Sequence, residues 1–168
     1  MPDGKTETMT AAEFNTMTAA GGGGGASERQ QQEALATWAA AAEAERPALR
    51  LLFHVPNGGA RSARSGARMK RLGAKKGVPD LCLPVPRAAS GETTAREQYG
   101  ALWIEMKAPP GGRMRRAQRW WRERLRRTGH AHAVCHSWEE ARRVLCSYLD
   151  GEGVPPATER REREGGGS

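Results

Sequence analysis

The stretch GALWIEMKAPPG, residues 100–111, decides the fold together with GVPDLCLPVPR at residues 77–87. Both have the apolar and branched residues of buried strands, yet each contains an acid. Because side chains alternate along a strand, Glu105 and Lys107 lie on one face and the apolar residues beside them on the other. If the two strands are neighbours, Asp80 at the start of one approaches Glu105 in the other.

Asp80 and Glu105, when adjacent, repel each other unless a cation lies between them. Carboxylate oxygens are hard ligands that suit Mg²⁺ or Mn²⁺. Such an ion holds water and a phosphate oxygen, and Lys107 is placed to stabilise the attacking hydroxide or the charge that develops on phosphorus. On the Glu-x-Lys pattern alone, an exposed salt bridge on an edge strand is the more ordinary interpretation.

The flanking sequence predicts an α/β domain with the element order α, β, β, β, α, β, α. In chain order we expect a helix over 28–45 capped by Ser27, strands over 49–58, 79–85 and 99–108, a helix over 113–129, a strand over 130–136 and a helix over 138–149 capped by Ser137. The basic segment 60–72, between the first two strands, can form an additional short helix before Gly73. The polar segment between the two middle strands, 86–98, suits a hairpin loop.

Composition separates the two ends of the chain from its middle. Residues 1–26 are small and polar and finish in five glycines, and residues 150–168 mix Gly, Pro and charges without an apolar period. Such segments bury too little apolar surface to offset their ordering entropy. We therefore expect two disordered tails around one domain at residues 27–149.

Membrane, disulfide and zinc chemistry are disfavoured. No apolar run approaches the roughly eighteen residues of a membrane helix, and the N-terminus lacks the order of a signal peptide. We expect a cytoplasmic protein without a membrane partner. The three cysteines, Cys82, Cys135 and Cys146, are widely spaced and suit buried reduced thiols. His130 and His132 share a strand face without a third ligand, so we interpret them as structural.

The charge of the chain is concentrated in its middle. Residues 61–127 hold eighteen Lys and Arg against five acids, whereas the whole chain has a net charge of +8. This pattern is typical of a protein that binds a phosphate backbone. Aromatic residues are not interleaved through the basic runs, which disfavours a platform on which single-stranded bases stack. The candidate DNA contacts are Asn57, Arg61, Arg64, Arg68, Lys70, Arg71, Lys75, Lys76, Arg113, Arg115 and Arg116.

Asn57, Gly58 and Gly59 allow two interpretations, a plain turn or a loop at the mouth of the site that contacts DNA.

The arginines at 113–127 favour contact with phosphate over a merely solvated helix face. Eight of them face only one acid, Glu123, so that mutual pairing leaves most of them free for phosphate.

The pair Pro79-Asp80, followed after twenty-four residues by Glu105-x-Lys107, resembles the signature of the PD-(D/E)XK nuclease superfamily, which has a restriction-endonuclease-like αβββαβ core with a mixed sheet flanked by helices. The surrounding text is more specific. The segments SERQQQEALATWA, HVPNGG, KKGVPDLCLPVPR, LWIEMKAPPGGRMRRAQRWW and SWEEARRVLCSYL resemble, in that order, the stand-alone virus-type replication-repair nuclease domain (VRR-NUC) of bacteria and phages. The resemblance covers about residues 27–149.

The resemblance implies roles for particular residues. Asp80 and Glu105 become metal ligands together with the backbone carbonyl of Met106, and Lys107 becomes the catalytic lysine. Gln118, on the helix after the Glu-x-Lys strand, orients the lysine or a phosphate. The family also has an acid on its first helix, for which Glu28 and Glu33 are both available. Glu28 is favoured because it stands four residues before Gln32, as in the Glu-x-x-x-Gln spacing of the family.

The implied activity is a Mg²⁺- or Mn²⁺-dependent endonuclease that selects DNA by structure, possible substrates being four-way (Holliday) junctions or other branched DNA. Stand-alone members of the family resemble junction resolvases, which implies a homodimer. The alternative is a DNA-binding protein that keeps the nuclease fold but performs no chemistry. The intact set of Asp80, Glu105 and Lys107 favours the enzyme, because binding alone does not require it.

Overall fold

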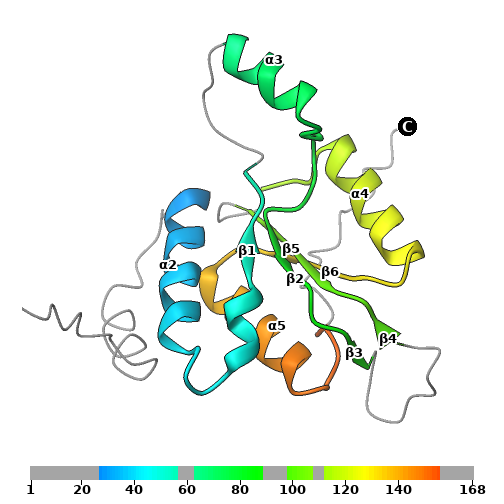
Figure 1. Cartoon of the computed structure of the whole chain (residues 1–168). Coiled ribbons are helices and arrows are strands. Elements are labelled where there is room, and N and C mark those ends of the chain that lie inside the picture. The colour runs from blue at the N-terminus through cyan, green and yellow to red at the C-terminus, as the bar shows by residue number, and fades with distance from the viewer. Residues whose placement is uncertain (1–26, 57–62, 89–97, 108–111, 156–168) are drawn as a thin grey trace, which may run out of the picture.

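The protein is described here by a computed structural model, which covers residues 27–56, 63–88, 98–107 and 112–155. A four-stranded sheet lies between helices, with α2 (Glu28–Ala41) and α5 (Trp138–Leu149) on one face and α4 (Arg116–Arg127) on the other (Figure 1). The strands are β1 (Phe53–His54), β2 (Leu81–Leu83), β5 (Leu102–Met106) and β6 (Ala131–Cys135), in the spatial order β1-β2-β5-β6. The pairs β1–β2 and β2–β5 are antiparallel and β5–β6 is parallel. The predicted α/β class and mixed sheet are therefore confirmed.

The apolar face of the sheet forms the core with α2 and α5. Leu102, Ile104 and Met106 alternate along β5 and are buried against Leu35 of α2 and Leu145 of α5. The intervening residues of β5 point to the opposite face, toward α4. The alternation predicted for ALWIEMK is thus present, and it directs Glu105 away from the hydrophobic core.

The helices begin where their capping residues stand. The Ser27 side chain accepts a hydrogen bond from the Gln30 amide, and Ser137 accepts one from the Glu140 amide. The turn from α4 to β6 has Gly129 at φ 79°, a left-handed conformation that glycine adopts without strain. These local signals fix α2, α4 and α5 close to their predicted positions.

The segment from Ala42 to Leu52 differs from the prediction. The helix expected over 28–45 ends at Ala41, and the start of the strand expected over 49–58 is instead the 3₁₀ helix η1 (Pro47–Leu51). Pro47 separates the two helices, since it disfavours helical backbone at Arg46 and has the φ that starts a new helix. Leu49 and Leu52, three residues apart, then turn inward together.

The hairpin predicted between the middle strands is present at its base. β3 (Arg87–Ala88) pairs with β4 (Gln98–Tyr99) in antiparallel fashion, and the residues between them lie outside the described ranges. At the other end, the described chain continues beyond Leu149. Asp150 pairs with Arg46 at 2.6 Å, and Val154 packs against the core.

α3 (Ala63–Arg71) stands away from the sheet above the amino-terminal end of α4 (Figure 1). Among the described residues, the three cysteines are free thiols and no helix has the length and apolarity to span a membrane. The tails predicted at residues 1–26 and 150–168 lie outside the described residues, except for residues 150–155, which the structure describes.

Candidate active site

The candidate site lies where β2 begins and β5 ends, at the edge of the sheet that is formed by the ends of these two central strands. Leu81 pairs with Ile104, and the two strands are antiparallel. Asp80, the residue before Leu81, therefore stands opposite Glu105, the residue after Ile104. Glu105 and Lys107 are both almost completely buried, and Asp80 is partly buried. The two acids and the lysine expected from the sequence are therefore brought to one place.

Asp80 is held by the main chain of the neighbouring strand. Its Oδ2 accepts a hydrogen bond of 2.9 Å from the Met106 amide. The Lys107 amide, by contrast, donates to the Cys135 carbonyl on β6. Because the N–H and C=O of one strand residue point to the same side, the Met106 carbonyl is directed toward Asp80 and away from β6. A main-chain carbonyl that binds a metal ion together with Asp80 must point in this direction.

Glu105 is bound by two side chains through one of its oxygens. Lys107 Nζ donates to Glu105 Oε1 at 2.5 Å, and the side-chain amide of Gln118 donates to the same atom. Gln118 stands in the first turn of α4, where its Oε1 accepts a hydrogen bond of 2.7 Å from the Arg115 amide. Gln118 thus fixes the start of α4 to the acid on β5.

The electrostatics of the two acids reflect this crowding. Burial raises the pKa of Glu105 to about 7, and repulsion from Asp80 and Glu28 adds to the effect while Lys107 opposes it. Burial also raises the pKa of Asp80, although the Met106 hydrogen bond opposes that rise and Glu28 reinforces it. Both shifts mean that negative charge at this edge is costly without a compensating cation.

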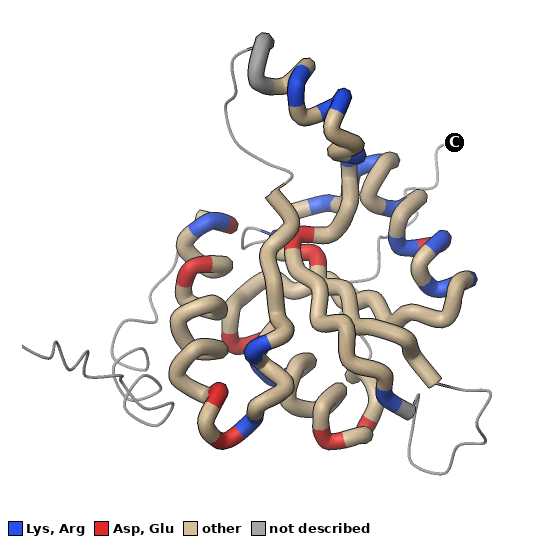
Figure 2. The backbone as a smooth tube through the Cα atoms, in the orientation of Figure 1, with Lys and Arg blue, Asp and Glu red and all other residues tan. Residues whose placement is uncertain are grey.

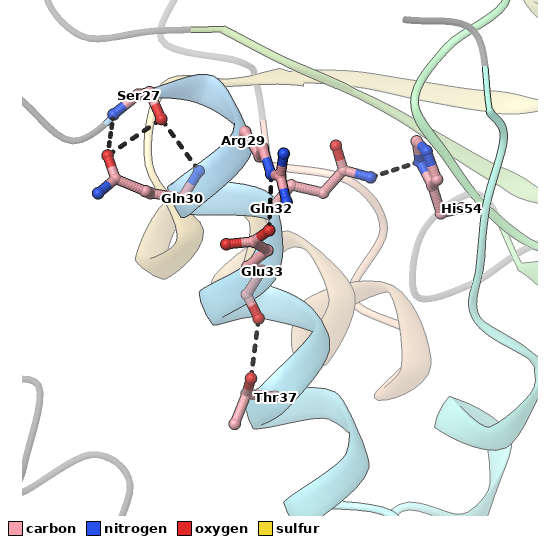
Figure 3. A network of polar contacts seen from close by, with 7 residues as sticks. All are labelled: Ser27, Arg29, Gln30, Gln32, Glu33, Thr37 and His54. Carbon is pink, nitrogen blue, oxygen red and sulfur yellow. Dashed lines mark hydrogen bonds and ion pairs between the residues drawn. The ribbon is translucent and has the colours of Figure 1, made fainter. Parts of the chain in front are cut away.

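The same interactions separate the two candidate acids of the first helix. Glu28 is close enough to raise the pKa of both Asp80 and Glu105. Glu33 instead pairs with Arg29 at 2.8 Å on the exposed side of α2 (Figure 3). The electrostatics therefore favour Glu28 over Glu33 as the first-helix acid near Asp80 and Glu105, and its role as a metal ligand stays a prediction.

Two further residues support Asp80 and were not singled out from the sequence as site residues. His54 Nδ1 lies 2.9 Å from the Asp80 carbonyl oxygen and also contacts the side-chain amide of Gln32 (Figure 3). Nδ1 of His54 cannot donate to the Asp80 carbonyl and at the same time accept from the Gln32 side chain. If Nδ1 carries the proton, Gln32 must therefore turn its amide oxygen toward His54. The available signal was indirect, since Gln32 belongs to the Glu-x-x-x-Gln spacing and His54 opens HVPNGG.

The residues at this edge fit a divalent cation. Glu105 Oε2 is buried and has no hydrogen-bond partner among the described residues, an arrangement that is costly for a carboxylate. Within the same residues, no three His, Cys, Asp or Glu side chains converge as a metal cluster. Asp80 and Glu105 would therefore supply two carboxylates, and a main-chain carbonyl and water the rest, a mixture that Mg²⁺ accepts.

Basic residues lie on α3, on α4 and on the segment between α3 and β2. Figure 2 shows Lys and Arg along both helices, whereas the acids of the neighbouring strands gather at the end of the sheet. The predicted DNA contacts with exposed side chains in this region are Arg68, Lys70, Arg71, Lys75, Lys76, Arg113, Arg115 and Arg116. Asn57 and Arg61 lie outside the described residues, as does the side chain of Arg64.

Gly77 lets the basic segment approach α4 closely. A Cβ added at Gly77 would lie 2.7 Å from Cβ of Ala117 and 2.9 Å from the Gln118 amide nitrogen, and its φ of 81° is left-handed. The Trp121 indole then donates to the Lys76 carbonyl at 3.1 Å. These contacts join the segment that leads into Asp80 to the helix that carries Gln118.

Comparison with known proteins agrees with this architecture. The sequence profile of the VRR-NUC domain matches residues 26–139. A solved structure described as a VRR_NUC domain protein superposes with a TM-score of 0.60 at 23% identity, over 81% of this chain and 98% of its own. At that identity the superposition establishes the fold alone. A search of curated proteins finds no match.

Proposed function

Because the chain belongs to the VRR-NUC family of nuclease domains, we propose that it is a Mg²⁺- or Mn²⁺-dependent endonuclease that hydrolyses phosphodiester bonds in DNA. One observation carries the proposal. Asp80, Glu105, Lys107 and Gln118 meet at a buried edge, where the second oxygen of Glu105 lacks a partner among the described residues. A surface salt bridge, the ordinary alternative for Glu-x-Lys, does not bury its acid completely.

Asp80 and Glu105 would hold the cation, which supplies Lewis acidity toward the phosphate and a more acidic water when bound. The Met106 amide fixes the orientation of Asp80, and Gln118 fixes that of Glu105. Lys107 Nζ, already beside Glu105, supplies positive charge next to the phosphate oxygen on which charge accumulates. The site is thus organised before substrate arrives, which is what electrostatic stabilisation of a transition state requires.

We further propose selection by DNA structure, with branched DNA as the favoured substrate and a homodimer as the active form. All but one of the predicted contacts are Lys and Arg, and contacts of such residues with phosphates carry no base code. A two-fold symmetric junction is best engaged by two copies related by a two-fold axis. Light scattering of the protein alone and bound to a four-way junction tests the dimer. A monomer in both, with junction cleavage intact, would refute it.

The activity is tested with end-labelled linear, flapped and four-way-junction DNA in Mg²⁺, in Mn²⁺ and in EDTA. We expect cleavage only with a divalent ion and faster cleavage of branched than of linear DNA. Glu33→Gln is a suitable control variant, because it removes an exposed carboxylate of α2 that pairs outside the site. If no substrate is cut with either metal while DNA is still bound, the protein is a binding module with a nuclease fold.

A further inference from the structure

A pocket of about 700 Å³ lies between the first turns of α4 and the segment that leads into β2. Two tryptophans of α4 form its apolar part, and four cations from two separate segments surround them. Its principal lining residues are Lys75, Lys76, Arg115, Arg116, Trp120 and Trp121. In the described part of the chain, no acid pairs with any of these four cations, so the pocket combines an aromatic surface with unneutralised positive charge.

Trp120 is the accessible aromatic surface of this pocket. It is 51% exposed, an unusual state for the largest apolar side chain in a small domain. Arg124, one turn further along α4, lies over its ring at 5.5 Å from the centroid and does not line the pocket. The ring of Trp121 meets that of Trp120 edge to face at 5.4 Å. Trp120 is therefore supported by its neighbours while part of it faces the open pocket.

The pocket is coupled to the catalytic edge through the helix that forms it. Arg115 and Arg116 directly precede Ala117 and Gln118, and Gln118 binds Glu105. Trp121 binds the Lys76 carbonyl, four residues before Asp80. Under the proposed function, a DNA strand bound at Asp80 and Glu105 therefore lies next to the helix that carries Trp120 and two of the pocket's cations.

We propose that this pocket binds an unpaired nucleotide of the DNA substrate, with its base stacked on Trp120 and its phosphates neutralised by Lys75, Lys76, Arg115 and Arg116. Every base has a π-face, so stacking on an indole accepts any sequence but requires a base that is free of its partner strand. The inference rests on the proposed function and deepens it, since it identifies the substrate as DNA with unpaired nucleotides next to a duplex.

The sequence pattern alone disfavours a surface on which unpaired bases stack, because aromatic residues are not interleaved through the basic runs. Trp120 and Trp121 are consecutive, and in the sequence the cations near them are the arginines of the same helix. The fold adds Lys75 and Lys76 from a segment about forty residues away, through the close contact of Gly77 with Ala117. A single-strand site is thus assembled from parts that are distant in the sequence.

The test measures DNA binding in EDTA, so that it does not depend on cleavage. The probes are fluorescent duplexes with equal numbers of phosphates, one blunt, one with a short single-stranded overhang and one with the same overhang made of abasic nucleotides. Wild-type protein should bind the overhang more tightly than the other two. Because the abasic probe keeps the phosphates and removes the bases, this comparison needs no variant and isolates stacking.

Trp120→Ala should reduce affinity for the overhang about 5- to 150-fold and leave affinity for the blunt duplex unchanged. Trp120→Tyr should retain most of the preference, since a tyrosine ring also stacks. Leu51→Ala, which truncates a similarly exposed apolar residue in η1, should behave as wild type. Equal affinity of wild type for the normal and abasic overhangs would overturn the proposal, as would an equal loss of both affinities in Trp120→Ala. Cleavage is measured separately with metal, so the nuclease proposal fails or survives independently.

Discussion

The Met106 amide donates a 2.9 Å hydrogen bond to the Asp80 carboxylate, so the strand that carries Glu105 also positions the acid of its neighbour. This relationship explains how two acids are held side by side on neighbouring strands. The position of Asp80 depends on main chain that cannot rearrange without breaking β5. Substitutions that preserve this hydrogen bond should therefore separate chemistry from folding.

Asp80→Asn is the first such substitution. The amide oxygen can still accept from Met106, but a neutral amide is a poor ligand for a hard cation. We expect Mn²⁺-supported cleavage to fall about 100-fold or more. Metal-free DNA affinity should be equal or higher, because a negative charge near phosphate is removed. Melting temperature, affinity and cleavage are measured together, and a parallel loss of all three would show that Asp80 is structural.

Gln118→Met tests whether the amide positions Glu105. The substitution keeps the length of the side chain and removes both the donor to Glu105 and the acceptor for the Arg115 amide. We expect metal affinity, measured by calorimetry, to fall about 10- to 100-fold, with DNA affinity in EDTA unchanged. Gln98→Met on the exposed face of β4 is the control. Unchanged metal affinity in Gln118→Met would contradict the positioning role.

The pH dependence of stability should carry the signature of Glu105. Its pKa is about 7 in the fold against an ordinary value of about 4.5, so the fold favours the neutral acid. This stabilisation is complete below about pH 4.5 and is lost as pH rises through 7. The change is on the order of 3 kcal/mol. In metal-free buffer, urea unfolding should show wild type losing stability over this range relative to Glu105→Gln.

His132 titrates in the opposite sense and must be separated from that effect. Burial lowers its pKa to about 4, so its contribution to stability is lost as pH falls from about 6.5 toward 4. Because Glu105→Gln retains His132, the difference between the two proteins cancels this contribution. Added Mg²⁺ should stabilise wild type increasingly as pH rises past 7. A pH-independent difference between wild type and Glu105→Gln would refute the assignment.

Gly77→Ala should disturb the junction between the basic segment and α4. Its Cβ would approach Ala117 to 2.7 Å, in addition to the strain of a left-handed φ. Gly73→Ala is a matched control, with φ 92° and open space around the added carbon. Strain alone costs about 1–2 kcal/mol, and overpacking adds about 1–3 kcal/mol at Gly77. Chemical unfolding checks this difference, and equal losses would show that the contact is loose.

The salt dependence of binding should report the cations at the start of α4. Each phosphate neutralised contributes about −0.9 to the log-log slope of affinity against salt. Arg115→Ala with Arg116→Ala should therefore flatten the slope by about 1.8 if both contact phosphate. The control is Arg29→Ala with Arg50→Ala, which removes two arginines that pair with acids elsewhere. An unchanged slope in the first double variant would place this part of α4 away from DNA.

The sequence predicted the elements whose signals are local. Alternation in ALWIEMK located Glu105 and Lys107, and serine caps located α2 and α5. The 3₁₀ turn at Pro47–Leu51 was missed because its leucines read equally well as a strand. Pro47 predicts the end of the helix before it, and in the structure it also starts the 3₁₀ helix that follows.

Contacts between distant segments could not be predicted in the same way. Nothing near Gln118 in the sequence indicates that its amide binds Glu105, because that bond depends on how α4 crosses the end of β5. The contact of His54 with the Asp80 carbonyl depends likewise on the β1–β2 register. The family resemblance supplied Gln118, and the residue pattern alone would have left it as one polar position on a basic helix.

The buried oxygen of Glu105 that has no partner among the described residues carries an evolutionary implication. Apolar residues in place of both Glu105 and Lys107 would be neutral or stabilising for a chain that only bound DNA, whereas loss of Glu105 alone would leave Lys107 buried without its acid. Under the proposed function, selection for hydrolysis keeps this costly pair. Glu105 and Lys107 should therefore be lost together when a relative becomes inactive.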